Sequence, residues 1–393
     1  MTDGKERQMD DLDAQLKKMR GELKRLQDER ACEQDVLQCT LASAHDLGTN
    51  SRGVPRAVLI VKQILASRGA TTEPGASRPS CAALHERTCR AMLAAATGGS
   101  DGAGDEGAGG QQPFRALAWV GVAWHLYADV VASLEGEAAL SGFVARWDAA
   151  ARRRAGGDEC GSSDSGVAVK EGPGRIGDRY ADALCLVLRE AVVQGRRAVD
   201  AVVVPSMTRA AVEDRKTGPE TVLTGMFEGV RALVREVCET MDRAGLPAVL
   251  QCQYVQQLVW HACASTVNHT VATAGACTSE YGVALALGLS ALEEWAHASP
   301  FRAQLTPLLA PCKELANVLA IGKCILAEPQ AAQDTFPALR TAQFLQVVRN
   351  ISGDAFDETL EKAWEHALAE DKRPEQHEAT LDTTQWVFYN AAD

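Results

Sequence analysis

The stretch "YGVALALGLSALEEW", residues 281–295, contains twelve uncharged residues followed by two glutamates and a tryptophan. The apolar run is too short to cross a bilayer, which takes about 20 residues. Its composition favours a helix in the protein interior that is buried all round. We therefore expect Trp295 to be largely buried at the end of this helix, and Glu293 and Glu294 to lie where the helix meets solvent.

The composition of the whole chain is that of a folded protein. Its 393 residues are 46% hydrophobic and only 5% aromatic, and the net charge is −12. Phosphate backbones repel such a chain, so nucleic acid is not an expected partner. The N-terminus carries charges where a signal peptide needs an apolar core, and no apolar run is long enough to span a membrane. These features predict a cytoplasmic protein without a transmembrane segment.

No pattern of chemically reactive residues is present in the sequence. The twelve cysteines are scattered through apolar surroundings, which indicates reduced interior cysteines rather than disulfides. Cys81, His85 and Cys89 can share one helix face, but they lack the fourth ligand of a closed zinc site. The "GPGRIG" at residues 172–177 lacks the strand that precedes a dinucleotide-binding loop, and there is no P-loop or nucleophile motif. We predict no catalytic residue, no metal, no cofactor and no enzymatic activity.

Helical periodicity runs through most of the chain. Apolar residues recur at i, i+3, i+4 and i+7 in residues 114–134, 180–203 and 221–245. Gly245 stands where a helix C-cap is expected. No run shows the alternation of a strand, so the sequence predicts an all-α fold. Two Gly-rich stretches, residues 96–113 and 152–179, are expected to be loops.

The N-terminal residues carry a heptad pattern. Apolar residues alternate at spacings of three and four between residues 5 and 30, with charges nearly everywhere else. This pattern predicts a short coiled coil and a possible homodimer, a single solvated helix being the alternative. The predicted dimer seam consists of Met9, Leu12, Leu16, Met19, Leu23 and Leu26.

The C-terminal residues carry most of the net negative charge. Residues 353–393 contain eleven acidic and three basic side chains. Such a segment is either a solvated acidic face or a docking surface for a basic partner.

Three segments of the sequence, the first of which contains the opening stretch, resemble a known domain in order and spacing. "VNHTVATAGACTSEYGVALALGLSALEEW", "LTPLLAPCKEL" and "LRTAQFLQVV" resemble, in order and spacing, the dilute (DIL) domain in the globular tails of myosin V and plant myosin XI. The matching positions are Asn268, Cys277, Leu292, Glu293, Glu294, Trp295, Leu305, Pro307, Leu308, Leu339 and Gln343. We expect Asn268 to be a satisfied interior hydrogen-bonding residue, ligand contact being the alternative.

The chain departs from this family at three places. His269 stands where a second asparagine is common. Residues 273–276 replace basic residues that usually precede the Cys-Ser pair, and the apolar run 283–289 replaces a family arginine. The loss of these polar groups affects any cargo contact that depends on them and leaves the fold intact.

The resemblance implies an elongated, two-lobed helical globular tail that follows a coiled-coil helix. It divides the chain into a coiled-coil segment at 1–40, a first lobe with a long connecting helix at 47–220, a DIL core at 221–370 and an acidic tail at 371–393 that packs back. "TLDTTQWVFYN" in this tail is similar to the family's C-terminal strand, which runs back over the first subdomain.

The function implied by the resemblance is cargo binding. A globular tail of this kind links an actin motor, on the same or another chain, to vesicles or organelles through Rab-type small GTPases and cargo adaptors. The implied location is the cytoskeleton or the vesicle surface. The alternative is a DIL-containing structural scaffold of the junctional or Ras-effector type.

Overall fold

The computed structural model describes residues 115–135, 176–211, 218–351 and 358–385, together with isolated residues between 15 and 92. Five residues of the predicted dimer seam lie outside the described residues. The sixth, Met19, is helical and 57% exposed. The dimer therefore stays a prediction. The predicted loop at 96–113 and the first part of that at 152–179 also lie outside.

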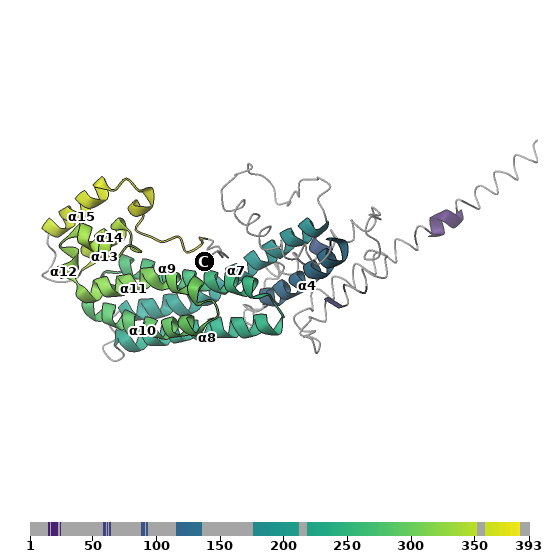
Figure 1. The fold of residues 1–393 in the computed structure, drawn as a ribbon, viewed down its shortest axis with the longest axis horizontal. Helices are drawn as coiled ribbons and strands as arrows, with labels where there is room; N and C mark the ends of the chain where they lie inside the picture. Colours follow the sequence, from purple (N-terminus) through teal and green to yellow (C-terminus); the bar gives the residue numbers. More distant parts are fainter. Residues whose placement is uncertain are drawn as a thin grey trace, which may run out of the picture.

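Every regular element in the described ranges is helical, which confirms the predicted all-α fold. In chain order the elements are α4 (Arg115–Glu135), α7 (Ile176–Ala211), α8 (Pro219–Arg243), α9 (Ala248–Ala272), η2 (Ala274–Ala276), α10 (Ser279–Ala298), α11 (Arg302–Ile321), α12 (Lys323–Leu326), α13 (Pro329–Thr335), α14 (Thr341–Asn350), α15 (Glu358–Glu370) and η3 (Pro374–His377). Figure 1 shows an elongated arrangement, in which α7 leads from α4 into the bundle formed with α8–α11, and α12–α15 lie at the far end.

Helix α7 is longer at its start than the sequence predicted. It begins at Ile176, within the stretch 152–179 that was expected to be a loop. The prediction was wrong for these last residues because the Gly- and Pro-rich part of the stretch ends at Gly174. A single glycine in the first turn, Gly177, is tolerated because helix ends fray and lose little from its low propensity.

The end of α8 confirms a local prediction. The helix stops at Arg243, and Gly245 has a φ of 64°, in the left-handed region that glycine adopts without strain. The backbone N–H of Leu246 donates to the carbonyl of Met241 at 3.1 Å, which satisfies one of the last helical acceptors. Gly245 therefore ends the helix as the sequence indicated.

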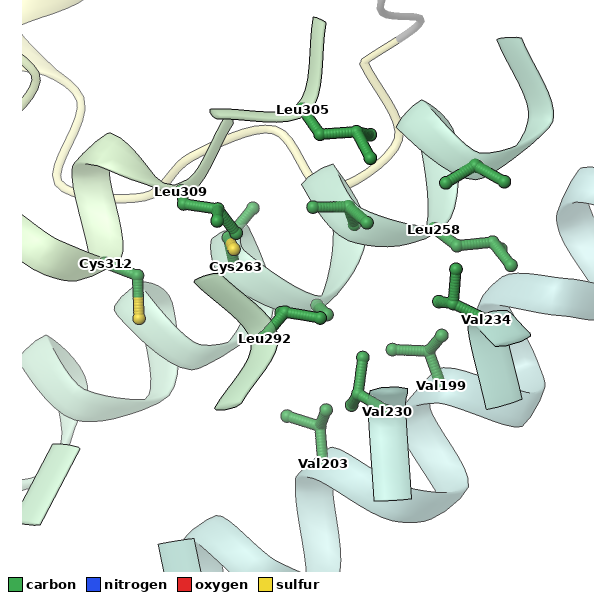
Figure 2. Close-up of a cluster of buried hydrophobic side chains, with 14 of the residues drawn as sticks. Val199, Val203, Val230, Val234, Leu258, Cys263, Leu292, Leu305, Leu309 and Cys312 are labelled. Atoms are coloured by element: carbon green, nitrogen blue, oxygen red, sulfur yellow. The ribbon is translucent and has the colours of Figure 1, made fainter. Parts of the chain in front are cut away.

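The main core lies where five helices meet. Figure 2 shows aliphatic side chains from α7 and α8 next to side chains from α9, α10 and α11. The labelled residues are Val199, Val203, Val230, Val234, Leu258, Cys263, Leu292, Leu305, Leu309 and Cys312, all of them buried. Since each buried aliphatic side chain contributes about 1.5–3 kcal/mol, this cluster is a main source of the stability of the bundle.

Helix α9 approaches α7 closely at one glycine. A Cβ atom added to Gly195 would lie 2.5 Å from the hydroxyl oxygen of Tyr254, so a larger residue does not fit. The Tyr254 hydroxyl donates to the carbonyl of Ala191 at 3.0 Å. Burial raises the pKa of this phenol, which therefore stays a neutral donor. Gly195 and Tyr254 together set the distance between the two helices.

Helix α10 is not buried all round, which corrects the first prediction. Val283 is 49% exposed and Leu287 is 48% exposed. Two glycines explain this arrangement, because Gly288 lies against the backbone of Leu223 in α8 and Gly282 lies against Ala320 in α11. The helix is therefore packed between two neighbours and keeps one face toward solvent.

The end of α10 also differs in part from the expectation. Trp295 packs against the core but is only partly buried. Glu294 is exposed, as predicted. The side chain of Glu293 is mostly covered, and its carboxylate accepts a hydrogen bond from Lys313 at 2.8 Å. Trp295 is less buried than predicted because α10 borders solvent along its length.

Candidate functional site

The polar side chains of α9 hold the C-terminal segment of the described chain, residues 381–385. The side-chain amide of Asn268 donates to the carbonyl of Leu381 at 2.8 Å and accepts from the backbone N–H of the same residue at 2.7 Å. The amide thus pairs with Leu381 as a neighbouring strand would. Asn268 is half-buried and satisfied, as the sequence predicted.

Trp260 and His261, which are neighbours in α9, bind the next two residues of the C-terminal segment, Asp382 and Thr383. Trp260 Nε1 donates to the carbonyl of Asp382 at 3.0 Å. The two ring nitrogens of the buried His261 lie 3.0 Å from the carbonyl of Thr383 and 2.8 Å from a carboxylate oxygen of Asp200 in α7. A carbonyl and an ionised carboxylate only accept hydrogen bonds. The imidazole of His261 therefore joins α7 to the C-terminal segment.

Arg196 of α7 completes the attachment. Its guanidinium donates to the carbonyls of Thr384 at 3.1 Å and Gln385 at 3.2 Å, and to the side-chain oxygen of Gln257 at 3.1 Å. Burial lowers the pKa of Arg196, and the carboxylate of Asp382 opposes this shift. The guanidinium keeps its charge in any case, because arginine starts from a pKa above 12.

Asp382 stabilises the segment from within. Its carboxylate accepts hydrogen bonds from the hydroxyl and the backbone N–H of Thr384. These bonds, with a contribution from the charge of Arg196, lower the pKa of Asp382. We call the contacts of residues 381–385 with Arg196, Trp260, His261 and Asn268 the C-terminal clasp.

From the sequence we singled out Asn268 but none of the other clasp residues. A signal was present, because "QCQYVQQLVWH" at residues 251–261 places glutamines and a histidine in an otherwise apolar helix. Gln253, Gln256, Gln257 and His261 are all buried. Most buried polar groups have hydrogen-bond partners, so these residues indicated that polar groups would face this helix.

The family-motif residues are spread over the bundle and do not form one site. Leu292, Leu305, Cys277, Leu339 and Gln343 are buried, Asn268, Glu293, Trp295 and Leu308 are partly buried, and Glu294 and Pro307 are exposed. Gln343 accepts a hydrogen bond from the backbone N–H of Arg340 at the start of α14. Burial raises the pKa of the Cys277 thiol to about 12, which leaves it unreactive at neutral pH. The geometry of these residues is that of packing and capping.

A small cavity of about 200 Å³ opens beside the start of α10. It is lined mainly by apolar groups from α10, α11 and α14. The lining residues are Cys277, Thr278, Ser279, Val318, Leu319, Gly322, Leu326, Val347 and Ile351. No charged side chain lines this cavity, so its described walls offer no acid, base or cation for a reaction.

Other kinds of site are not found in the described part of the chain. No three His, Cys, Asp or Glu side chains there lie close enough to hold a metal ion. No helix there is long and apolar enough to cross a membrane.

Comparison with known proteins identifies the core of the chain. Residues 253–355 match the DIL domain family. No curated protein sequence matches the chain significantly.

Solved structures match over most of the length. Myo2-GTD in complex with Mmr1 is 11% identical, with a TM-score of 0.52 and 91% of each chain covered. The apo structure of Myo2-GTD is also 11% identical, with a TM-score of 0.50, covering 92% of this chain and 93% of that one. Myo2-GTD in complex with Smy1 is 11% identical, with a TM-score of 0.51, covering 80% and 72%. The predicted resemblance is confirmed: residues 253–355 match the DIL domain family, and the helical fold is similar to that of Myo2-GTD.

Proposed function

We propose that this chain is a non-catalytic cargo-binding module that links actin-based transport to vesicles or organelles. The observation that carries this proposal is the DIL domain at residues 253–355 inside a fold shared with Myo2-GTD over nine-tenths of the chain. Myo2-GTD has been solved in complexes with Mmr1 and with Smy1, so this fold presents surfaces to protein partners. Adaptor proteins and Rab-type small GTPases are the partner classes we propose for this chain.

The organisation of the chain is part of the proposal. A coiled-coil segment at 1–40 joins two copies through Met9, Leu12, Leu16, Met19, Leu23 and Leu26. A first lobe at 47–220, a DIL core at 221–370 and an acidic tail at 371–393 follow. The clasp supports the last boundary, because residues 381–385 are bonded to α7 and α9 rather than extending into solvent.

A binding experiment tests the function directly. The full chain is immobilised and exposed to a panel of purified Rab proteins, each loaded with GTP or with GDP, and to cargo adaptors. We expect at least one GTP-loaded Rab or one adaptor to be retained, since a carrier must recognise its vesicle in the active state. An unrelated acidic helical protein of similar charge is the matched control. Retention of no panel member above this control contradicts the proposal.

The scaffold alternative predicts a different outcome of the same experiment. In a scaffold the DIL domain is structural and does not itself distinguish GTP-loaded from GDP-loaded Rab proteins, whereas a transport adaptor prefers the GTP-loaded form. Equal retention of GTP-loaded and GDP-loaded proteins, with no adaptor bound, would favour the scaffold.

A further inference from the structure

The exposed face of α10 carries a line of four residues with a simple pattern. Glu280, Val283, Leu287 and Glu294 are all exposed and follow one another at spacings of three, four and seven residues. Residues with these spacings lie on one face of a helix. With a rise of 1.5 Å per residue, the line is about 21 Å long. We call these four residues the α10 stripe.

The stripe is apolar in the middle and acidic at both ends. Val283 and Leu287 are two of the few large hydrophobic side chains that are exposed in the described residues. Neither Glu280 nor Glu294 has an ion-pair partner there, whereas the neighbouring Glu293 is paired with Lys313. The stripe therefore combines exposed aliphatic groups with two carboxylates that have no ion-pair partner among the described residues.

Packing of α10 does not require these aliphatic side chains. The inner faces of the helix are occupied by Gly282 against α11, by Gly288 against α8 and by the buried Leu292. Exposed aliphatic groups at helical spacing are a recognised mode of helix-to-helix docking between proteins.

The negative charges of Glu280 and Glu294 favour a basic partner over a second copy of this chain. A second copy of this chain would bring carboxylates toward the acidic stripe, and the net charge of −12 adds to the repulsion. A helix with basic ends instead places a Lys or Arg near Glu280 and another near Glu294. We propose that the α10 stripe is the docking surface for an amphipathic helix of a partner protein, with aliphatic residues at its centre and basic residues at both ends. This inference rests on the proposed function, since it names the chemistry of one protein partner.

Binding of two synthetic peptides to the full chain tests the inference. The first peptide is a helix of about 20 residues with leucines on one face of its middle turns and two lysines or arginines in each terminal turn. The second contains the same residues, with the leucines distributed around the helix. Fluorescence anisotropy of labelled peptides gives the affinities. We expect the first peptide to bind at least about tenfold more tightly than the second.

Three variants locate the site. Val283→Ser with Leu287→Ser should weaken binding of the first peptide at least about tenfold. Glu280→Gln with Glu294→Gln should weaken it about threefold at low salt and remove most of the salt dependence. Val204→Ser removes an aliphatic side chain on α7 that is 48% exposed and should leave binding unchanged. All these positions are exposed, so the variants are expected to fold.

Several results would overturn the inference. Equal affinity for the two peptides, or unchanged affinity after the Val283 and Leu287 substitutions, shows that the stripe is not the contact. A doubled mass in light scattering that the same substitutions abolish shows that a second copy is the occupant. If the full chain retains a GTP-loaded Rab or an adaptor but does not bind the first peptide, the proposed function is supported and the inference about the α10 stripe is wrong. Failure of the inference can therefore be distinguished from failure of the proposed function.

Discussion

Helices α9 and α10 have similar apolar sequences but opposite surroundings. Helix α9 buries polar residues, including Gln257 and His261, whereas α10 exposes the aliphatic Val283 and Leu287. Helix α9 packs against α7 and α11 and is bonded to the C-terminal segment, while α10 packs mainly against α8 and α11 in the described part of the chain. The comparison shows that the number of neighbours around a helix, more than its mean hydropathy, decides which of its residues are buried.

The largest change in the free energy of unfolding is expected for a substitution on the buried face of α10, compared with one on its exposed face. Leu292→Ala removes a fully buried side chain from the core in Figure 2 and should lower the free energy of unfolding by about 3–5 kcal/mol. Leu287→Ala on the exposed face should change it by less than about 0.5 kcal/mol. Urea denaturation of the two variants measures this difference. Equal losses would mean that both faces of α10 are packed.

Substitution of Trp295 is expected to lower the free energy of unfolding by a smaller amount. Because its side chain is partly buried, Trp295→Ala should cost about 1–3 kcal/mol, less than the 3–5 kcal/mol typical of a buried tryptophan. Glu293→Ala breaks a surface ion pair with Lys313 and should cost under about 1 kcal/mol. Glu294→Ala serves as the exposed control. Chemical denaturation that ranks a glutamate variant above the tryptophan variant contradicts this packing.

Asn268 tests the clasp on α9. Asn268→Leu removes both partners of Leu381 and should cost about 1–2 kcal/mol, because the segment can detach and regain water. Asn268→Asp keeps an acceptor for the backbone N–H of Leu381 and should cost less. Hydrogen exchange of residues 378–385, followed by mass spectrometry, should accelerate in the leucine variant. Unchanged exchange in this variant would show that other contacts hold the segment.

The smallest effect is a pH dependence at Asp382. Its pKa is lowered in the folded protein, so its contribution to stability is complete above the unfolded pKa of about 4 and is lost as the pH falls through the lowered pKa. Asp382→Asn lacks this contribution at every pH. The difference in unfolding free energy between parent and variant should therefore shrink below about pH 4. A difference that grows on acidification has the wrong sign for this account.

Much of the fold could be predicted from local patterns. The helices at 180–203 and 221–245 follow from their periodicity, and Gly245 ends α8 as expected. The DIL resemblance rested on contiguous residues around Cys277 and Trp295, and the family match covers them. The clasp could not be predicted in the same way, because Asn268 and Leu381 are 113 residues apart along the chain.

The sequence by itself determined the all-α class, the end of α8 at Gly245 and the residues that match the DIL family, because these depend on residues within a few turns of one another. The tertiary structure alone decided that α10 keeps one face toward solvent and that His261, Arg196 and Asn268 bind the C-terminal segment. Burial and hydrogen bonding of this kind depend on which distant elements pack around a helix. Gly282 and Gly288 allow neighbouring helices to approach α10 closely because they lack a side chain. The sequence does not show which helices these are, so the role of the two glycines becomes clear only from the tertiary structure.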